Sequence, residues 1–112
     1  MSKVLFYAMS GEKLCFLHVL MNAVDLAGKG NEVKVIFEGK SVVLAPQLDE
    51  EKNPLFQKAR DAGLIAGVCR ACAMQFGVAE KAEAIGLTLI SDMMGHAGMA
   101  SYVADGYQVI SM

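Results

Sequence analysis

The sequence has no tryptophan, only two prolines and no long uninterrupted hydrophobic run. No apolar stretch approaches the roughly 18 residues that read as a transmembrane helix, so we expect no membrane partner. Lysine and arginine form no block and the formal net charge is −2, which argues against direct nucleic-acid binding. The beginning of the chain reaches a polar turn too early for a secretory signal. These absences predict a cytoplasmic protein.

Cysteine is also scarce, since the chain has three cysteines and therefore an odd number. Without a signal for export, this argues against a disulfide framework and favours reduced thiols. Apolar residues, by contrast, are abundant: 54% of the 112 residues are hydrophobic and 20% are charged. This is apolar for a chain with so much surface per unit volume. We therefore expect one domain over residues 1–112 that buries part of its surface in a homo-oligomer.

Short apolar segments alternate with helical ones along the chain. This alternation predicts a three-layer α/β/α sandwich of about five mainly parallel strands with helices on both faces. The segment 64–68 is an unbroken apolar run, which places it at the centre of the sheet. Residues 39–46 are compatible with a short helix or an apolar flap, and the charged segment 47–52 predicts a solvated loop. Strands are expected at 3–8, 32–37, 64–68, 87–90 and 107–111, and helices at 12–27, 54–62, 71–76, 79–85 and 99–104.

In parallel sheets, ligands and reactive groups gather beyond the carboxyl ends of the strands. This rim is predicted to hold Ser10, Gly11, Glu38, Cys69 and the flexible loop around His96. The sequence thus predicts one functional edge of the sheet.

Two cysteines, Cys69 and Cys72, lie three residues apart in GVCRACAMQFGV. Cys69 is predicted where a strand ends and a helix begins, so unpaired backbone N–H groups and the helix dipole would favour a thiolate. Arg70 beside it would act in the same direction and lower the pKa of the thiol. Cys72, one helical turn on, would face the same side. The alternative is that both are small buried core residues.

A metal site is a further alternative for these thiols. Cys15 and His18, together with Cys69 and Cys72, would supply four suitable zinc ligands. However, Cys15 and His18 lie within a regular helix, where His18 belongs to a solvated polar stripe that continues through residues 22, 25 and 29. His96 with its neighbouring methionines suggests a soft-metal site, although core or interface methionines are more common. We therefore expect no bound metal.

A thioredoxin-type dithiol is the next alternative, because C-x-x-C in an α/β protein is its usual sign. The rest of that pattern is missing here. Pro46 and Pro54 both precede the cysteines, and no tryptophan stands before Cys69.

The segment Val68–Val78, VCRACAMQFGV, resembles the DsrE-like sulfur-relay family, which includes subunits of the TusD type. In that family a strand ends in a cysteine, a short alanine-rich helix follows, and a Gly-Val pair closes it. The resemblance extends over nearly the whole chain as a single DsrE-like domain. The family's sulfur-carrying cysteine falls on Cys69.

The resemblance implies a small subunit, assembled as a trimer or hexamer, that receives sulfur as a persulfide from a protein donor and passes it to a protein acceptor. It implies no organic cofactor and a sulfurtransferase-like activity. In this hypothesis Cys69 carries the sulfur and Arg70 assists electrostatically. Cys72 resolves the persulfide or serves as a second sulfur-carrying thiol, and His96 adjusts protonation at the mouth of the site. TusD-type members usually have a small apolar residue where Cys72 stands. A C-x-x-C redox or redox-sensing protein and a non-catalytic homo-oligomeric binding module remain alternatives.

Overall fold

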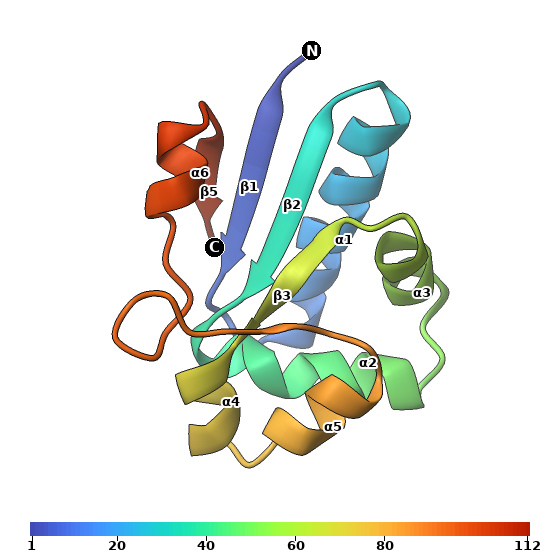
Figure 1. The fold of residues 1–112 in the computed structure, drawn as a ribbon. Coiled ribbons are helices and arrows are strands. Elements are labelled where there is room, and N and C mark those ends of the chain that lie inside the picture. Colours follow the sequence, from blue (N-terminus) through green and yellow to red (C-terminus); the bar gives the residue numbers. More distant parts are fainter.

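A computed structural model describes residues 1–112 as one parallel sheet with α-helices on both faces, which confirms the predicted fold class (Figure 1). The strand order is β4-β3-β2-β1-β5, and every neighbouring pair is parallel. All five predicted strands are present, although β4 and β5 begin later than predicted and β3 is shifted by one residue. Their bounds are β1 (Lys3–Ala8), β2 (Glu32–Phe37), β3 (Ile65–Cys69), β4 (Leu89–Ile90) and β5 (Gln108–Ser111).

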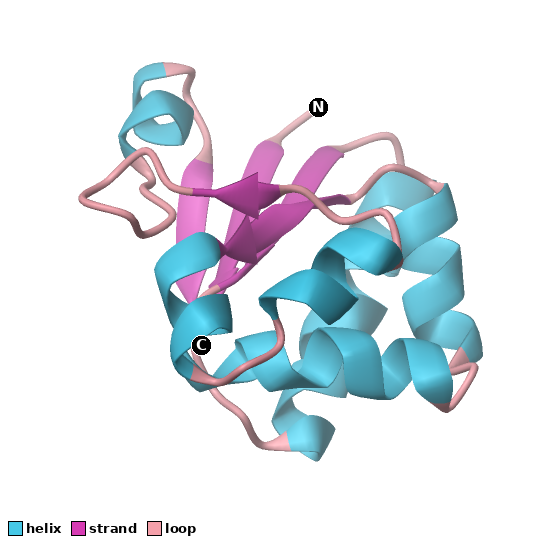
Figure 2. Cartoon of the chain, turned by 60° about the horizontal axis from the view of Figure 1, so that its bottom comes forward, coloured by secondary structure: helices cyan, strands magenta, loops and turns pink.

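The strand order decides which face each helix covers. From β1 to β4 the chain moves steadily across the sheet, so right-handed crossovers put the connecting helices on one face. The return from β4 to β5 brings α6 (Ala100–Ala104) to the opposite face, as Figures 1 and 2 show. No helix is long and apolar enough to cross a membrane. The connections between β1 and β4 contain α1 (Lys13–Gly28), a 3-10 helix (Gly39–Val43), α2 (Leu44–Glu50), α3 (Pro54–Asp61), α4 (Arg70–Gln75) and α5 (Ala79–Ala84).

The core on the helical face is built around Phe37 of β2. Its ring lies 4.6 Å from that of Phe16 on α1 and 6.4 Å from that of Phe56 on α3, measured between centroids. All three side chains are completely or almost completely buried. Burying a side chain of this size contributes about 2–3 kcal/mol, so this aromatic cluster fixes α1 and α3 against the sheet.

The predicted start of α3 is confirmed in detail. Oδ1 of Asn53 accepts hydrogen bonds from the backbone N–H groups of Leu55 and Phe56, each 3.0 Å long. Pro54 occupies the first helical position, where its missing N–H costs nothing.

The prediction of a loop at residues 47–52 was wrong, because α2 continues through Glu50. Leu48 lies completely buried on its inner side, and Asp49 pairs with Arg60 of α3 at 2.6 Å. Of the charged residues that suggested a loop, Asp49 and Glu50 belong to this short helix, and only Glu51 and Lys52 lie in the turn after it.

The prediction that β3 lies at the centre of the sheet was also wrong, since β2 occupies the centre and β3 lies next to the short edge strand β4. Ile65 and Ala66 are only half-buried. Gly67 shows how closely β4 approaches: a Cβ atom there would lie 2.6 Å from the carbonyl oxygen of Thr88 and 2.7 Å from the side chain of Ile90. The glycine thus allows the segment that leads to His96 to pack against β3.

Candidate functional site

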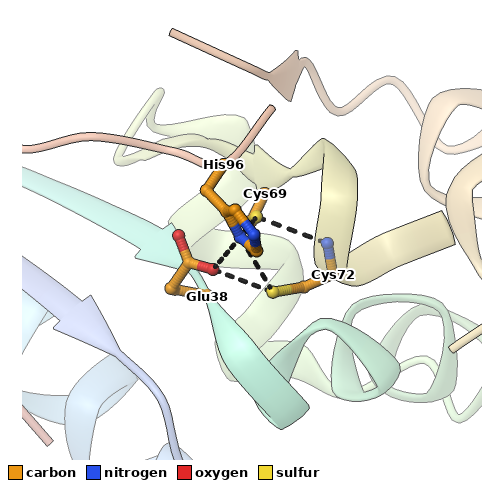
Figure 3. A group of neighbouring side chains, drawn as sticks. All are labelled: Glu38, Cys69, Cys72 and His96. Carbon is orange, nitrogen blue, oxygen red and sulfur yellow. Dashed lines mark hydrogen bonds and ion pairs between the residues drawn. The ribbon is translucent and has the colours of Figure 1, made fainter. Parts of the chain in front are cut away.

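Four side chains meet at the carboxyl edge of the sheet, as Figure 3 shows: Glu38, Cys69, Cys72 and His96. Glu38 directly follows β2, Cys69 ends β3, Cys72 lies on α4, and His96 lies in the loop after β4. We call this group the tetrad. One ligand atom from each residue lies within 4.8 Å of every other. Parallel strands bring these residues together because their carboxyl ends share one edge.

Nδ1 of His96 is the common contact of the tetrad. It lies 3.3 Å from Sγ of Cys69, 3.5 Å from Sγ of Cys72, and 3.5 Å from Oε1 of Glu38. Both thiols and the carboxylate therefore contact the same ring nitrogen. In a Cys-His-Asp triad the carboxylate instead holds the opposite nitrogen, so the tetrad is a different arrangement.

Glu38 is a buried carboxylate whose oxygens are both engaged. Its Oε1 accepts hydrogen bonds from the thiol of Cys72 at 2.9 Å and from the backbone N–H of Gly39 at 3.1 Å. The hydroxyl of Tyr7 lies 2.9 Å from Oε2 and 2.7 Å from the carbonyl oxygen of Ala97. Burial tends to raise the pKa of Glu38, but the hydrogen bonds outweigh it and hold the pKa below its ordinary value. Glu38 is therefore ionised at neutral pH.

Cys69 occupies the position just before α4, and its Sγ accepts the backbone N–H of Cys72 at 3.4 Å. The residue is completely buried. Burial raises the pKa of the Cys69 thiol and the carboxylate of Glu38 raises it further, while backbone N–H groups of Cys72 and Ala97 oppose the rise. The helix start therefore acts in the expected direction, but burial and Glu38 outweigh it, so the expectation of a lowered pKa for Cys69 was wrong.

Cys72 is half-buried beside Cys69. Burial, the hydrogen bond to Glu38 and the neighbouring Cys69 raise the pKa of its thiol to about 12. The thiol form suits its contacts, because it donates its proton to a carboxylate. Cys72 is thus held protonated at neutral pH.

His96 is positioned by a tight turn within the loop after β4. Met93 and His96 exchange two backbone hydrogen bonds of 2.9 and 2.8 Å. Between them, Met94 and Gly95 have φ angles of 53° and 88°, the pattern of a type I′ turn. The carbonyl oxygen of Gly95 accepts the N–H of Ala71 at 2.9 Å, which ties the turn to α4. The His96 side chain is 44% exposed, so the tetrad reaches solvent on this side.

The match to known proteins covers most of the chain that forms this site. Residues 6–112 match the model of the DsrE/DsrF-like family. The chain belongs to that family. It is 38% identical over 99 residues to "Uncharacterized protein MJ0733" of Methanocaldococcus jannaschii, a match that covers 86% of this chain and 78% of the relative. No solved structure matches it significantly.

In this DsrE/DsrF-like protein, Arg70 lies apart from the tetrad. Its side chain is exposed and lines a surface depression of about 500 Å³ together with Met74, Lys81 and Leu89. No hydrogen bond or ion pair joins Arg70 to either cysteine of the tetrad. An assisting role for Arg70 stays a prediction.

The zinc set considered from the sequence does not assemble. Cys15 is exposed on α1, and Nδ1 of His18 contacts the carbonyl oxygen of Leu14 at 3.0 Å within the same helix. The structure combines Cys69 and Cys72 with Glu38 and His96 instead.

Sequence reasoning placed Glu38 on the rim but gave it no role, and it missed Tyr7 altogether. Both residues stand at the ends of strands: Tyr7 is the last residue but one of β1, and Glu38 directly follows β2. A signal was available, since a carboxylate that follows a buried parallel strand at the edge containing two thiols is a candidate partner for them. Because tetrad residues come from separate segments, only the assembled sheet shows that they touch.

Proposed function

We propose that this DsrE/DsrF-like protein carries sulfur as a persulfide on Cys69, as a sulfurtransferase-like relay subunit. The observation that supports this most is the position of Cys69. Its sulfur lies at the carboxyl edge of the sheet, within 3.4 Å of the Cys72 backbone N–H and 3.3 Å of His96 Nδ1. Family membership agrees with sulfur transfer in general terms.

The transfer step requires no outside oxidant. The Cys69 thiol gives its proton to Nδ1 of His96, and the thiolate attacks the outer sulfur of the donor persulfide. A new S–S bond forms on Cys69, the S–S bond of the donor breaks, and the donor leaves as a thiolate that takes up a proton. The sulfane sulfur keeps its oxidation state. Delivery to an acceptor thiol is the same exchange in reverse.

The contacts favour Cys69 over Cys72 as the carrier. Two backbone N–H groups near Cys69 act to stabilise an anion on its sulfur. Cys72 faces the negative carboxylate of Glu38, to which it donates its thiol proton, and this penalises a thiolate. The two thiols therefore have different roles, with Cys69 as nucleophile and Cys72 as a neighbouring thiol.

A second candidate function follows from how close the two sulfurs lie. Attack of Cys72 on the inner sulfur of a Cys69 persulfide would form a Cys69–Cys72 disulfide and release hydrosulfide, so the sulfane sulfur is the oxidant. The shared contact of both thiols with His96 Nδ1 favours this step. It would make the protein a thiol-disulfide redox protein instead of a carrier.

The proposal includes a homo-oligomer, a trimer or hexamer, and protein partners that donate and accept the sulfur. Exposed apolar side chains support an assembled form, among them Leu14 (64% exposed), Val103 (57%) and Ile110 (41%). The proposal places the relay in the cytoplasm, where thiols stay reduced. Size-exclusion chromatography with light scattering tests the assembly, and a monomer at micromolar concentration would contradict it.

Incubation with a small persulfide donor tests the loading step. We expect the intact mass of the reduced, metal-free protein to rise by one sulfur atom. Cys69→Ser should abolish this gain, while the matched variant Cys15→Ser should keep it, because Cys15 lies outside the tetrad on α1. Equal gains in all three forms would contradict the proposal.

A further inference from the structure

We propose that the tetrad of Glu38, Cys69, Cys72 and His96 is a binding site for Zn²⁺. This inference concerns a ligand that the sulfur-carrier function does not require, and it stands without that function. It also departs from our expectation from the sequence that the chain binds no metal.

The spacing of the ligand atoms is close to that of a four-coordinate site, since every pair lies within 4.8 Å. With Zn–S bonds of about 2.3 Å and Zn–N or Zn–O bonds of about 2.0–2.1 Å, neighbouring ligand atoms of a tetrahedral site lie about 3.3–3.8 Å apart. The three contacts of His96 Nδ1, at 3.3, 3.5 and 3.5 Å, fall within that range. The contact between Cys72 and Glu38 is shorter, at 2.9 Å, because a thiol proton lies in it. It lengthens when a metal replaces that proton.

The donor types select the metal. Two thiolates and an imidazole suit Zn²⁺, whereas Mg²⁺ and Ca²⁺ prefer sites made of oxygen ligands. Binding of Zn²⁺ displaces one proton from each thiol, so two protons leave as one ion enters. Two thiolates and the Glu38 carboxylate bring three negative charges, which the ion reduces to one. The ion thus removes most of the repulsion that would oppose ionising both thiols.

Residues around the tetrad already hold its ligands in place. The hydroxyl of Tyr7 contacts Oε2 of Glu38 at 2.9 Å, which leaves Oε1 directed at Cys72 and His96. The backbone N–H of Cys72 donates to Sγ of Cys69, a contact that suits a metal-bound thiolate. Such outer contacts orient ligands and raise metal affinity.

A second set of contacts fixes the His96 ring. The type I′ turn at Met94 and Gly95 brings His96 back toward α4, and the hydrogen bond from Ala71 to Gly95 keeps it there. Met94 adopts a left-handed φ of 53° although it is not glycine, which costs about 1 kcal/mol or more. The fold therefore uses a costly turn to present one imidazole to two thiols and a carboxylate.

The consequence is that metal and sulfur exclude each other. A Zn²⁺ ion in the tetrad engages the sulfurs of both Cys69 and Cys72, so neither is free to accept sulfane sulfur. Metal occupancy would hold the dithiol in an unreactive form.

Titration of the reduced, metal-stripped full-length protein with Co²⁺ and then Zn²⁺ tests the site. We expect one Co²⁺ per chain, with thiolate-to-cobalt charge-transfer absorption and the visible bands of a tetrahedral ion, and displacement by one Zn²⁺. Cys69→Ser and Cys72→Ser should each lower the affinity more than about 100-fold, and Tyr7→Phe about tenfold. The double variant Cys15→Ser/His18→Gln should bind as the parent does.

The variants are compared by circular dichroism so that loss of fold is recognised. If Cys69→Ser does not fold, Glu38→Gln and His96→Gln replace it, since each keeps the size of the side chain. Absence of stoichiometric Co²⁺ in the folded parent would overturn the proposal. The proposal would also be overturned if the single variant Cys72→Ser and one of the single variants Glu38→Gln and His96→Gln both bound Co²⁺ as tightly as the parent. Because the readout is metal absorption without a sulfur donor, its failure is distinct from failure of persulfide loading.

Discussion

The thiol of Cys72 and the carboxylate of Glu38 share a hydrogen bond of 2.9 Å at the carboxyl edge of the sheet. This contact acts on both groups: it lowers the pKa of Glu38 and raises the pKa of Cys72. The dithiol therefore rests in its protonated form beside an ionised carboxylate. Chemistry at these thiols begins when a proton leaves or a metal replaces it.

Glu38→Gln is expected to make both tetrad thiols more reactive. The carboxylate raises the pKa of Cys69 and of Cys72, and glutamine removes its charge with little change of shape. A fall of one unit in pKa gives about ten times more thiolate, so we expect at least about tenfold faster alkylation of Cys72 at pH 8. Peptide mapping after timed alkylation measures this. Unchanged or slower labelling would show that Glu38 does not control the thiols.

Alkylation of the parent protein should depend on pH in a specific way. Because the pKa of Cys72 is raised to about 12, only about one molecule in 10⁴ holds its thiolate at pH 8 in the metal-free protein. The rate should rise about tenfold per pH unit until the pH nears 12. The exposed Cys15 is the reference within the same chain, and Cys72 should react at least about 100-fold more slowly at pH 8. Labelling of both at similar rates would contradict the burial and hydrogen bonding described for Cys72.

How far the sequence predicts the fold depends on how local each signal is. Strand and helix periodicity and the Asn53-Pro54 cap lie within a few residues, and these predictions were confirmed. Segment 47–52 was misread because its charged residues hide one buried position, Leu48. The place of β3 next to the edge depends on strand order, which composition does not encode.

The site was predictable in position but not in chemistry. Functional groups gather beyond the carboxyl ends of parallel strands, which predicted that Glu38, Cys69 and His96 lie at one edge of the sheet. The structure confirms that placement. The pKa of Cys69 was mispredicted because only the helix start is visible in the sequence. The burial of Cys69 and its proximity to Glu38, which follows β2, depend on the tertiary fold. The orientation of His96 depends on the turn at Met94 and Gly95 and was equally hidden.

Gly67→Ala is expected to destabilise the protein through strand β4. The added Cβ would lie 2.6 Å from the Thr88 carbonyl oxygen, and overpacking of this kind typically costs about 1–3 kcal/mol. Gly28→Ala is the matched control, because nothing lies within 4 Å of a Cβ at the end of α1. Urea denaturation of both variants measures the difference. A loss of stability in Gly28→Ala equal to that in Gly67→Ala would show that the close approach of β4 is not the cause.

Met94→Asn is expected to stabilise the protein by about 1 kcal/mol, because asparagine tolerates a left-handed backbone better than methionine does. The Met94 side chain is fully exposed, so the substitution removes no packing. Met74→Asn is the control: Met74 is also exposed but lies within α4, where asparagine brings no such gain. Thermal unfolding compares the two. A lower melting temperature for Met94→Asn would contradict the strain assigned to the turn.

The location of the transferred sulfur atom tests the central claim most directly. Metal-free parent protein and Cys72→Ser are loaded with the same persulfide donor, trapped by alkylation and mapped by peptide mass spectrometry. We expect the sulfur on Cys69 in both, with a longer-lived persulfide in Cys72→Ser because no neighbouring thiol can displace it. Sulfur found on Cys72 in the parent, or its absence from Cys69 in the folded Cys72→Ser variant, would contradict the assignment of Cys69 as the carrier.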